Sequence, residues 1–139
     1  MSLVRNAILA HLQADTGAGG VATLTGDRIY PDVAPEGSAS PFVTVMVRRS
    51  ETPTRVFQAV GFEEVELLVR VTAKELTPKN AAAINRRVRT RLDGASLAIS
   101  GYTVRSVEWA GNIPGYPEVV DGQTYRHEGS RIYVMLEPS

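Results

Sequence analysis

Apolar residues near the N-terminus recur at helical spacing and predict a first helix near residues 3–14. Glycines at positions 17, 19 and 20 end it, and a further short turn at Val21–Leu24 fits the pattern. The apolar positions of the helix are Leu3, Val4, Ala7, Ile8, Ala10 and Leu12.

A period of two in the residue pattern predicts two strands in the middle of the chain. Residues 42–48 alternate, with their valines on the side expected to be buried. Residues 62–73 give the clearest strand pattern of the chain, with Val65, Leu67, Val69 and Val71 on one side. Residues 50–61 have no period and predict a long excursion between these strands.

The second helix is the clearest element in the sequence. Thr77 is a typical N-cap and Pro78 suits the first helical position. Asp93-Gly94 ends the helix, with Gly94 as a left-handed cap. The positions expected to face the core are Ala81, Ile84, Val88 and Leu92.

The last third of the chain predicts two strands separated by a loop. Residues 102–110 form the first, and Val104 and Val107 break its alternation, which predicts a bulge. Residues 111–122 are rich in Pro and Gly and predict a loop, and Tyr125–Leu136 predicts the final strand. Residues 31–41, earlier in the chain, are also rich in Pro and predict another loop. Because proline lacks a backbone N–H donor, this segment cannot be a central strand.

This order of elements predicts a single domain over residues 1–139. Its fold class is α+β, with a mainly antiparallel sheet and two principal helices packed on one face. The length of 139 residues suits one core.

Composition excludes several classes of protein. The chain has no cysteine, so it forms neither disulfides nor thiolate metal sites. Its 15 basic residues balance 15 acidic ones, which argues against a nucleic-acid binder and slightly favours self-association. No apolar run approaches the roughly 20 residues needed to span a bilayer, and the N-terminus does not fit a signal peptide.

Few residues are candidates for chemistry. His11 and His127 are the only histidines, and neither lies in a metal-binding motif, so both are expected to be ordinary surface or half-buried residues. Glu63, Glu64 and Glu66 predict a solvated strand face or an ionic partner for a neighbouring subunit, because no loop with calcium-binding spacing accompanies them.

The second helix is basic, through Arg86, Arg87, Arg89 and Arg91. At about 100° per residue, helical geometry spreads these side chains around the exposed side of the helix. The favoured role for them is therefore a solvated helix face. Salt bridges between subunits come next, and phosphate contacts last. The glycines at 17–20 lack a phosphate-loop context. No catalytic, cofactor-binding or metal-binding residue is predicted, and no enzymatic activity.

An ordered set of segments resembles the small tail-completion proteins of long-tailed phages, prophages and gene transfer agents, which are similar to tail terminators. The set comprises DRIYPDVAPEGSASPFVTV, VELLVRVTA, AAAINRRVRTRLDG, LAISGYTVRSVEWAG and YRHEGSRIYVMLEP. The resemblance implies a subunit of a hexameric ring on the head-proximal end of the tail tube, in the tail or neck of a virion assembled in the host cytoplasm. The ring would stop tube growth and offer a surface for head joining.

The partners that this resemblance implies are other copies of the chain, the tail tube protein, and a head–tail connector or head-closure protein. Residues Pro31–Pro41 are expected either to contact a neighbour or to wrap the edge of their own sheet.

Two alternative functions stay open: another neck protein, such as a head-closure or head–tail joining subunit, and a small enzyme of unknown activity. The candidate subunit or tube interface comprises Arg55, Val56, Phe57, Glu63, Glu64, Arg86 and Arg87.

Overall fold

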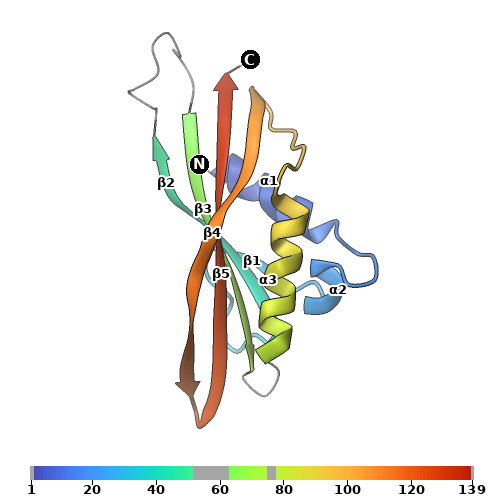
Figure 1. Cartoon of the computed structure of the whole chain (residues 1–139), viewed down its shortest axis with the longest axis vertical. Helices are drawn as coiled ribbons and strands as arrows, with labels where there is room; N and C mark the ends of the chain where they lie inside the picture. The colour runs from blue at the N-terminus through green and yellow to red at the C-terminus, as the bar shows by residue number, and fades with distance from the viewer. Residues whose placement is uncertain (1, 52–62, 75–77, 139) are drawn as a thin grey trace.

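A computed structural model describes residues 2–51, 63–74 and 78–138 (Figure 1). Its elements follow the order helices, strands, helix, strands. They are α1 (Ser2–Gln13), α2 (Val21–Thr25), β1 (Ile29–Pro31), β2 (Phe42–Glu51), β3 (Glu63–Lys74), α3 (Pro78–Leu92), β4 (Tyr102–Val120) and β5 (Gln123–Pro138).

The strands form one sheet in the order β1-β2-β3-β5-β4. Three neighbouring pairs are antiparallel, but β1 runs parallel to β2, with Ile29 opposite Val43. The sheet is therefore mainly antiparallel, as predicted, but it is mixed, because it contains one parallel pair that the sequence did not predict. Parallel neighbours need a connection that returns to the same end of the sheet, and the Pro-rich residues 32–41 provide it.

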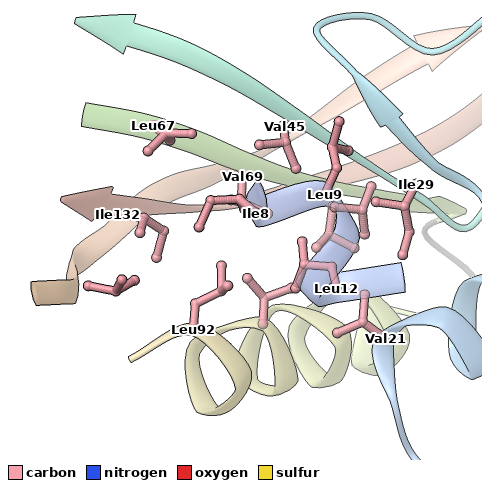
Figure 2. Close-up of a cluster of buried hydrophobic side chains, with 14 of the residues drawn as sticks. Ile8, Leu9, Leu12, Val21, Ile29, Val45, Leu67, Val69, Leu92 and Ile132 are labelled. Carbon is pink, nitrogen blue, oxygen red and sulfur yellow. The ribbon is translucent and has the colours of Figure 1, made fainter. Parts of the chain in front are cut away.

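The core lies between the sheet and the helices, and α1 and α3 lie on the same side of the sheet (Figures 1 and 2). Strand residues of one parity supply the sheet side of this core, because successive side chains point to opposite faces. The predicted core positions of β3 and α3 are all buried. They are Val65, Leu67, Val69, Val71, Ala81, Ile84, Val88 and Leu92.

Helix α1 agrees with the prediction in its extent but only partly in its buried side. Val4, Ile8 and Leu12 are fully buried, at i, i+4 spacing. Leu3, predicted on the apolar side, is 49% exposed, and Leu9 is buried instead. At about 100° per residue, Leu3 is turned away from the axis of the stripe that Val4, Ile8 and Leu12 define.

Residues 111–122 are not a loop, contrary to the prediction. Strand β4 continues to Val120 and pairs with β5 as far as the Val120–Gln123 pair, and Asp121-Gly122 forms the turn. Both turn residues have positive φ, 51° and 76°, which is typical of the two-residue turn that Asp-Gly favours. Prolines are tolerated here because β4 is an edge strand, where a missing N–H need not break a pairing.

Three register shifts bend β4 along its length. One lies between Val104 and Ser106, which confirms the predicted bulge, and another lies between Ile113 and Tyr116, around Pro114. The far half of the β4–β5 hairpin projects beyond the end of α3 (Figure 1). Its tip exposes two apolar side chains, Val119 at 69% and Val120 at 45%.

Candidate functional site

The predicted interface residues belong to three separate parts of the chain, and the structure describes two of these parts. Arg55, Val56 and Phe57 lie outside the described residues. Glu63 and Glu64 begin β3 and are half-buried, opposite Leu136 and Met135 of β5. Arg86 and Arg87 lie on α3, where Arg86 is exposed and Arg87 forms an ion pair with Asp15 rather than with either of these glutamates.

Glu66 is not part of a solvated strand face, contrary to the prediction, because only 6% of its surface is exposed. The register of β2 shifts between Val47 and Arg49, which brings two successive arginines opposite Glu66. Arg48 Nη1 lies 3.9 Å from one carboxylate oxygen, and Arg49 Nε lies 3.6 Å from the other. A buried carboxylate with two cationic neighbours belongs to the subunit's own structure.

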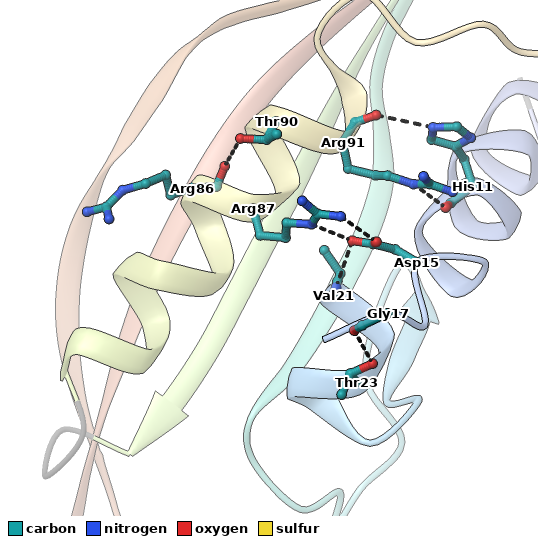
Figure 3. A network of polar contacts seen from close by, with 9 residues as sticks. All are labelled: His11, Asp15, Gly17, Val21, Thr23, Arg86, Arg87, Thr90 and Arg91. Carbon is teal, nitrogen blue, oxygen red and sulfur yellow. Dashed lines mark hydrogen bonds and ion pairs between the residues drawn. The ribbon is translucent and has the colours of Figure 1, made fainter. Parts of the chain in front are cut away.

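The arginine side chains of α3 have separate roles. Arg87 donates two hydrogen bonds to Asp15, of 2.8 and 2.7 Å (Figure 3). Arg91 donates to the backbone oxygen of His11 at 3.1 Å, and the guanidinium of Arg89 stacks 3.9 Å from the ring centre of Trp109. Arg86 is exposed. Three of the four arginines therefore hold the subunit together.

Asp15 connects three parts of the fold. One of its carboxylate oxygens also accepts the backbone N–H of Val21 at 2.9 Å, at the start of α2, so the carboxylate joins that helix to Arg87 of α3. The hydrogen bond from Arg87 is the main reason that the pKa of Asp15 is lowered, to about 2. Gly20 is required beside it, because a Cβ there would lie 2.2 Å from the Asp15 backbone oxygen.

A polar cleft of about 210 Å³ opens between α3 and β4. One of its lining residues, Asn85, is buried and accepts a 2.7 Å hydrogen bond from Ser130, whose hydroxyl in turn accepts one from Trp109 Nε1 at 3.2 Å. Arg86 and Arg89 line this cleft.

A larger cleft, of about 570 Å³, lies between residues 34–38 and the β4–β5 hairpin, and we call it the acidic cleft. Three of its lining residues are acidic, and none of the described residues that line it is Lys or Arg. The lining residues are Ala34, Pro35, Glu36, Gly37, Ser38, Phe42, Thr72, Glu118, Val120, Asp121, Tyr125 and His127.

His127 lies in the floor of the acidic cleft and is buried, although the sequence predicted a surface or half-buried residue. Its Nδ1 lies 2.9 Å from Thr72 Oγ1 and its Nε2 lies 3.0 Å from Glu118 Oε1. Tyr116 stacks on the ring at 4.7 Å. A neutral imidazole satisfies both contacts if the Thr72 hydroxyl donates to Nδ1 and Nε2–H donates to Glu118.

Within residues 2–51, 63–74 and 78–138, no group of three or more His, Cys, Asp or Glu side chains could hold a metal ion. No helix among these residues is long and apolar enough to cross a membrane.

Sequence reasoning missed the acidic cleft, because residues 111–122 were assigned to a loop. The signal that would have revealed its hairpin wall is Asp121-Gly122, a dipeptide typical of tight hairpin turns, between apolar runs. The other wall, residues 34–38, is brought to the hairpin only by the tertiary fold.

Two solved structures have the same fold. A chain described as "Virion of native gene transfer agent (GTA) particle" aligns with a TM-score of 0.73 at 18% identity, over 96% of this chain and 94% of that chain. A second solved chain aligns with a TM-score of 0.55 at 14% identity, over 99% of this chain and 94% of that one. No curated protein sequence matches the chain.

One family model matches the sequence, over residues 6–127, and is described as tail completion protein gp17. The match runs from α1 into β5, and so includes every helix and strand at least in part. It covers far more than half of the chain. The chain therefore belongs to the tail completion protein gp17 family, whose members are structural proteins of phage tail assembly.

Proposed function

We propose that this protein is a tail terminator: it forms a ring, of six subunits, on the head-proximal end of the tail tube. The ring stops tube growth and provides the surface to which the head is joined. Its partners are further copies of the chain, the tail tube protein, and a connector or head-closure protein. It acts in the tail or neck of the virion after assembly in the host cytoplasm.

The family match over residues 6–127 carries this proposal, because it concerns a completion step of tail assembly and includes nearly the whole domain. The similarity to a chain of a gene transfer agent virion adds support at the level of the fold. The described surface is compatible with self-association, since the hairpin tip exposes Val119 and Val120, which an interface could bury.

The interface that we propose contains Arg55, Val56 and Phe57, together with Glu63, Glu64 and Arg86. The sequence also predicts Arg87 in this interface, but the Arg87 side chain donates two hydrogen bonds to Asp15. We therefore propose that Arg87 supports the interface by orienting α3 rather than by contacting a neighbour.

Tail length tests the terminator role directly. Particles should be assembled with and without the protein and measured by electron microscopy. Without it, we expect overlong tails that are not joined to heads. Tails of normal length that still join heads would overturn the proposal, and tails of normal length that fail to join heads would favour a head-closure role instead.

Variants of the 52–62 segment test the interface assignment. Replacing both Arg55 and Phe57 with Ala should reproduce the tail defect while the circular dichroism spectrum and unfolding midpoint stay unchanged. Replacing Thr54 and Gln58 with Ala is the matched control, since it removes polar uncharged groups from the same segment. Normal tails with the first variant would refute the assignment of this segment, even if the terminator role holds.

A further inference from the structure

The acidic cleft is preformed within one subunit. Its floor contains Thr72 and His127, both buried and joined by a 2.9 Å hydrogen bond. Tyr116 stacks on His127, which fixes the ring in place. A cleft whose floor is held by such contacts can bind a segment without first becoming ordered itself, which lowers the entropic cost of binding.

The chemistry of the lining defines what would bind there. Glu36 and Asp121 are exposed at the cleft, and Glu118 adds a third carboxylate. Pro35, Phe42 and Tyr125 and the tip residue Val120 add apolar surface. A complementary occupant is therefore a peptide segment that presents a cation beside aromatic and aliphatic side chains.

Residues 52–62 of this chain have that composition. Their sequence is TPTRVFQAVGF, with one cation, Arg55, and no acidic residue. Val56 and Phe57 follow Arg55 directly. The segment thus combines positive charge with large apolar side chains, as the cleft requires.

A subunit cannot place this segment in its own acidic cleft. Phe42, which lines the cleft, begins β2, and Glu51, which precedes the segment, ends it. β2 has 10 residues, so at about 3.4 Å per residue its ends lie roughly 30 Å apart. A segment anchored at both Glu51 and Glu63 reaches at most about 20 Å from its anchors, at about 3.5 Å per residue. The segment therefore has to come from another copy.

We propose that the acidic cleft binds residues 52–62 of a second copy of this chain, with Arg55 facing the carboxylates of Glu36 and Asp121. The inference rests on the proposed ring for its biological setting and names one contact within it. Because cleft and segment are different surfaces of the same chain, the contact is head-to-tail, and such contacts generate closed rings when the rotation closes.

Disulfide trapping tests this contact well, since the natural chain has no cysteine. One preparation carries Gln58→Cys and another carries Ser38→Cys, which lies at the cleft. Mixing them under oxidising conditions, at high concentration and in assembled particles, should yield a covalent pair on a non-reducing gel. The matched control replaces Ser38→Cys with Ala83→Cys, an exposed position on α3, and should yield none.

Charge reversal tests the recognition itself. Glu36→Lys with Asp121→Lys should lower the yield of the Gln58–Ser38 cross-link about tenfold, which corresponds to about 1.4 kcal/mol. Adding Arg55→Glu to the partner preparation should restore the yield. An effect of Glu36→Lys with Asp121→Lys that Arg55→Glu does not rescue would overturn the proposal.

Two further results would also overturn it: no covalent pair in either setting, or a chain carrying both cysteines that closes on itself as a cross-linked monomer. These outcomes are independent of tail length. If the cross-link forms but tails assembled without the protein are normal, the contact stands and the terminator role is refuted. If tails assembled without the protein are defective but no cross-link forms, the terminator role stands and the contact is refuted.

Discussion

At the scale of single residues, the most consequential contact joins positions far apart in the sequence. Asp15 and Arg87 are separated by 72 positions, yet their side chains form two hydrogen bonds. Asp15 is only 4% exposed, so loss of its partner would leave a buried carboxylate without its cation. The sequence alone did not indicate that Arg87 makes this internal contact whereas its neighbour Arg86 is exposed.

The Asp15 contact predicts a pH dependence of stability. The folded pKa of Asp15, about 2, lies below the unfolded value of 3.8. The stabilisation is therefore fully present above about pH 4 and is lost as pH falls toward 2. Asp15→Asn should lower the free energy of unfolding at pH 7 by on the order of 2 kcal/mol and flatten its dependence between pH 4 and 2. Urea unfolding across this range measures both effects.

The matched control for Asp15→Asn is Asp32→Asn. Asp32 also bonds an arginine, Arg5, at 2.8 Å, but its side chain is 54% exposed. Exposed pairs contribute about 0–1 kcal/mol, so this variant should unfold almost as the parent does. His11, whose pKa is lowered mainly by burial and then by Arg91, adds a decline in stability below about pH 6.5, and Asp15→Asn should make this decline slightly larger because the Asp15 charge raises that pKa. Equal losses for Asp15→Asn and Asp32→Asn would contradict the role assigned to Asp15.

At the scale of elements, α3 and β3 could be predicted from local pattern. Their apolar positions have clear periods of 3.6 and 2, and Pro78 and Gly94 mark the limits of the helix. Strand β4 could not be predicted to its full length, because Pro and Gly weaken strand propensity. The edge position and the partner β5 outweigh that propensity.

The buried side of α3 gives a prediction for Leu92, which is fully buried. Leu92→Ala should lower the free energy of unfolding by about 2–5 kcal/mol, because it removes apolar contacts and leaves a cavity. Thermal or urea unfolding of the purified protein measures this change. Leu3→Ala is the control, since it makes the same chemical change at a side chain that is 49% exposed, and it should cost far less. An unchanged midpoint for Leu92→Ala would mean that α3 buries a different side.

At the scale of the whole molecule, the domain is one sheet with helices over its core and a hairpin that extends past them (Figure 1). The two clefts lie at the margins of this sheet, where loops and edge strands meet the core elements. Exposed residues at such margins, such as Glu36 and Asp121, can be varied without disturbing the core, because they contribute little to its packing.

The whole fold should form without a metal ion. The chain has no cysteine, and the part described by the structure has no cluster of metal-binding side chains. Treatment with EDTA followed by gel filtration should leave the unfolding temperature unchanged. Release of a stoichiometric metal with loss of the fold would contradict this expectation, and elemental analysis of the untreated protein provides the reference.

The sequence by itself determined the elements whose signals are local. Periodic apolar positions predicted α1, α3, β2 and β3, and the order of these elements together with a few short segments indicated the family that the match over residues 6–127 identifies. Local signals suffice for such elements because periodicity and capping act between residues only a few positions apart.

Only the tertiary structure decided the features that depend on distant residues. The parallel pairing of β1, the burial of Glu66 between Arg48 and Arg49, and the Asp15–Arg87 bond each need partners brought together by the fold. The acidic cleft likewise exists only where residues 34–38 meet the hairpin. The strength of such a contact depends on which residues lie around it in space. Those residues are far apart in the sequence, so no short sequence pattern predicts the contact.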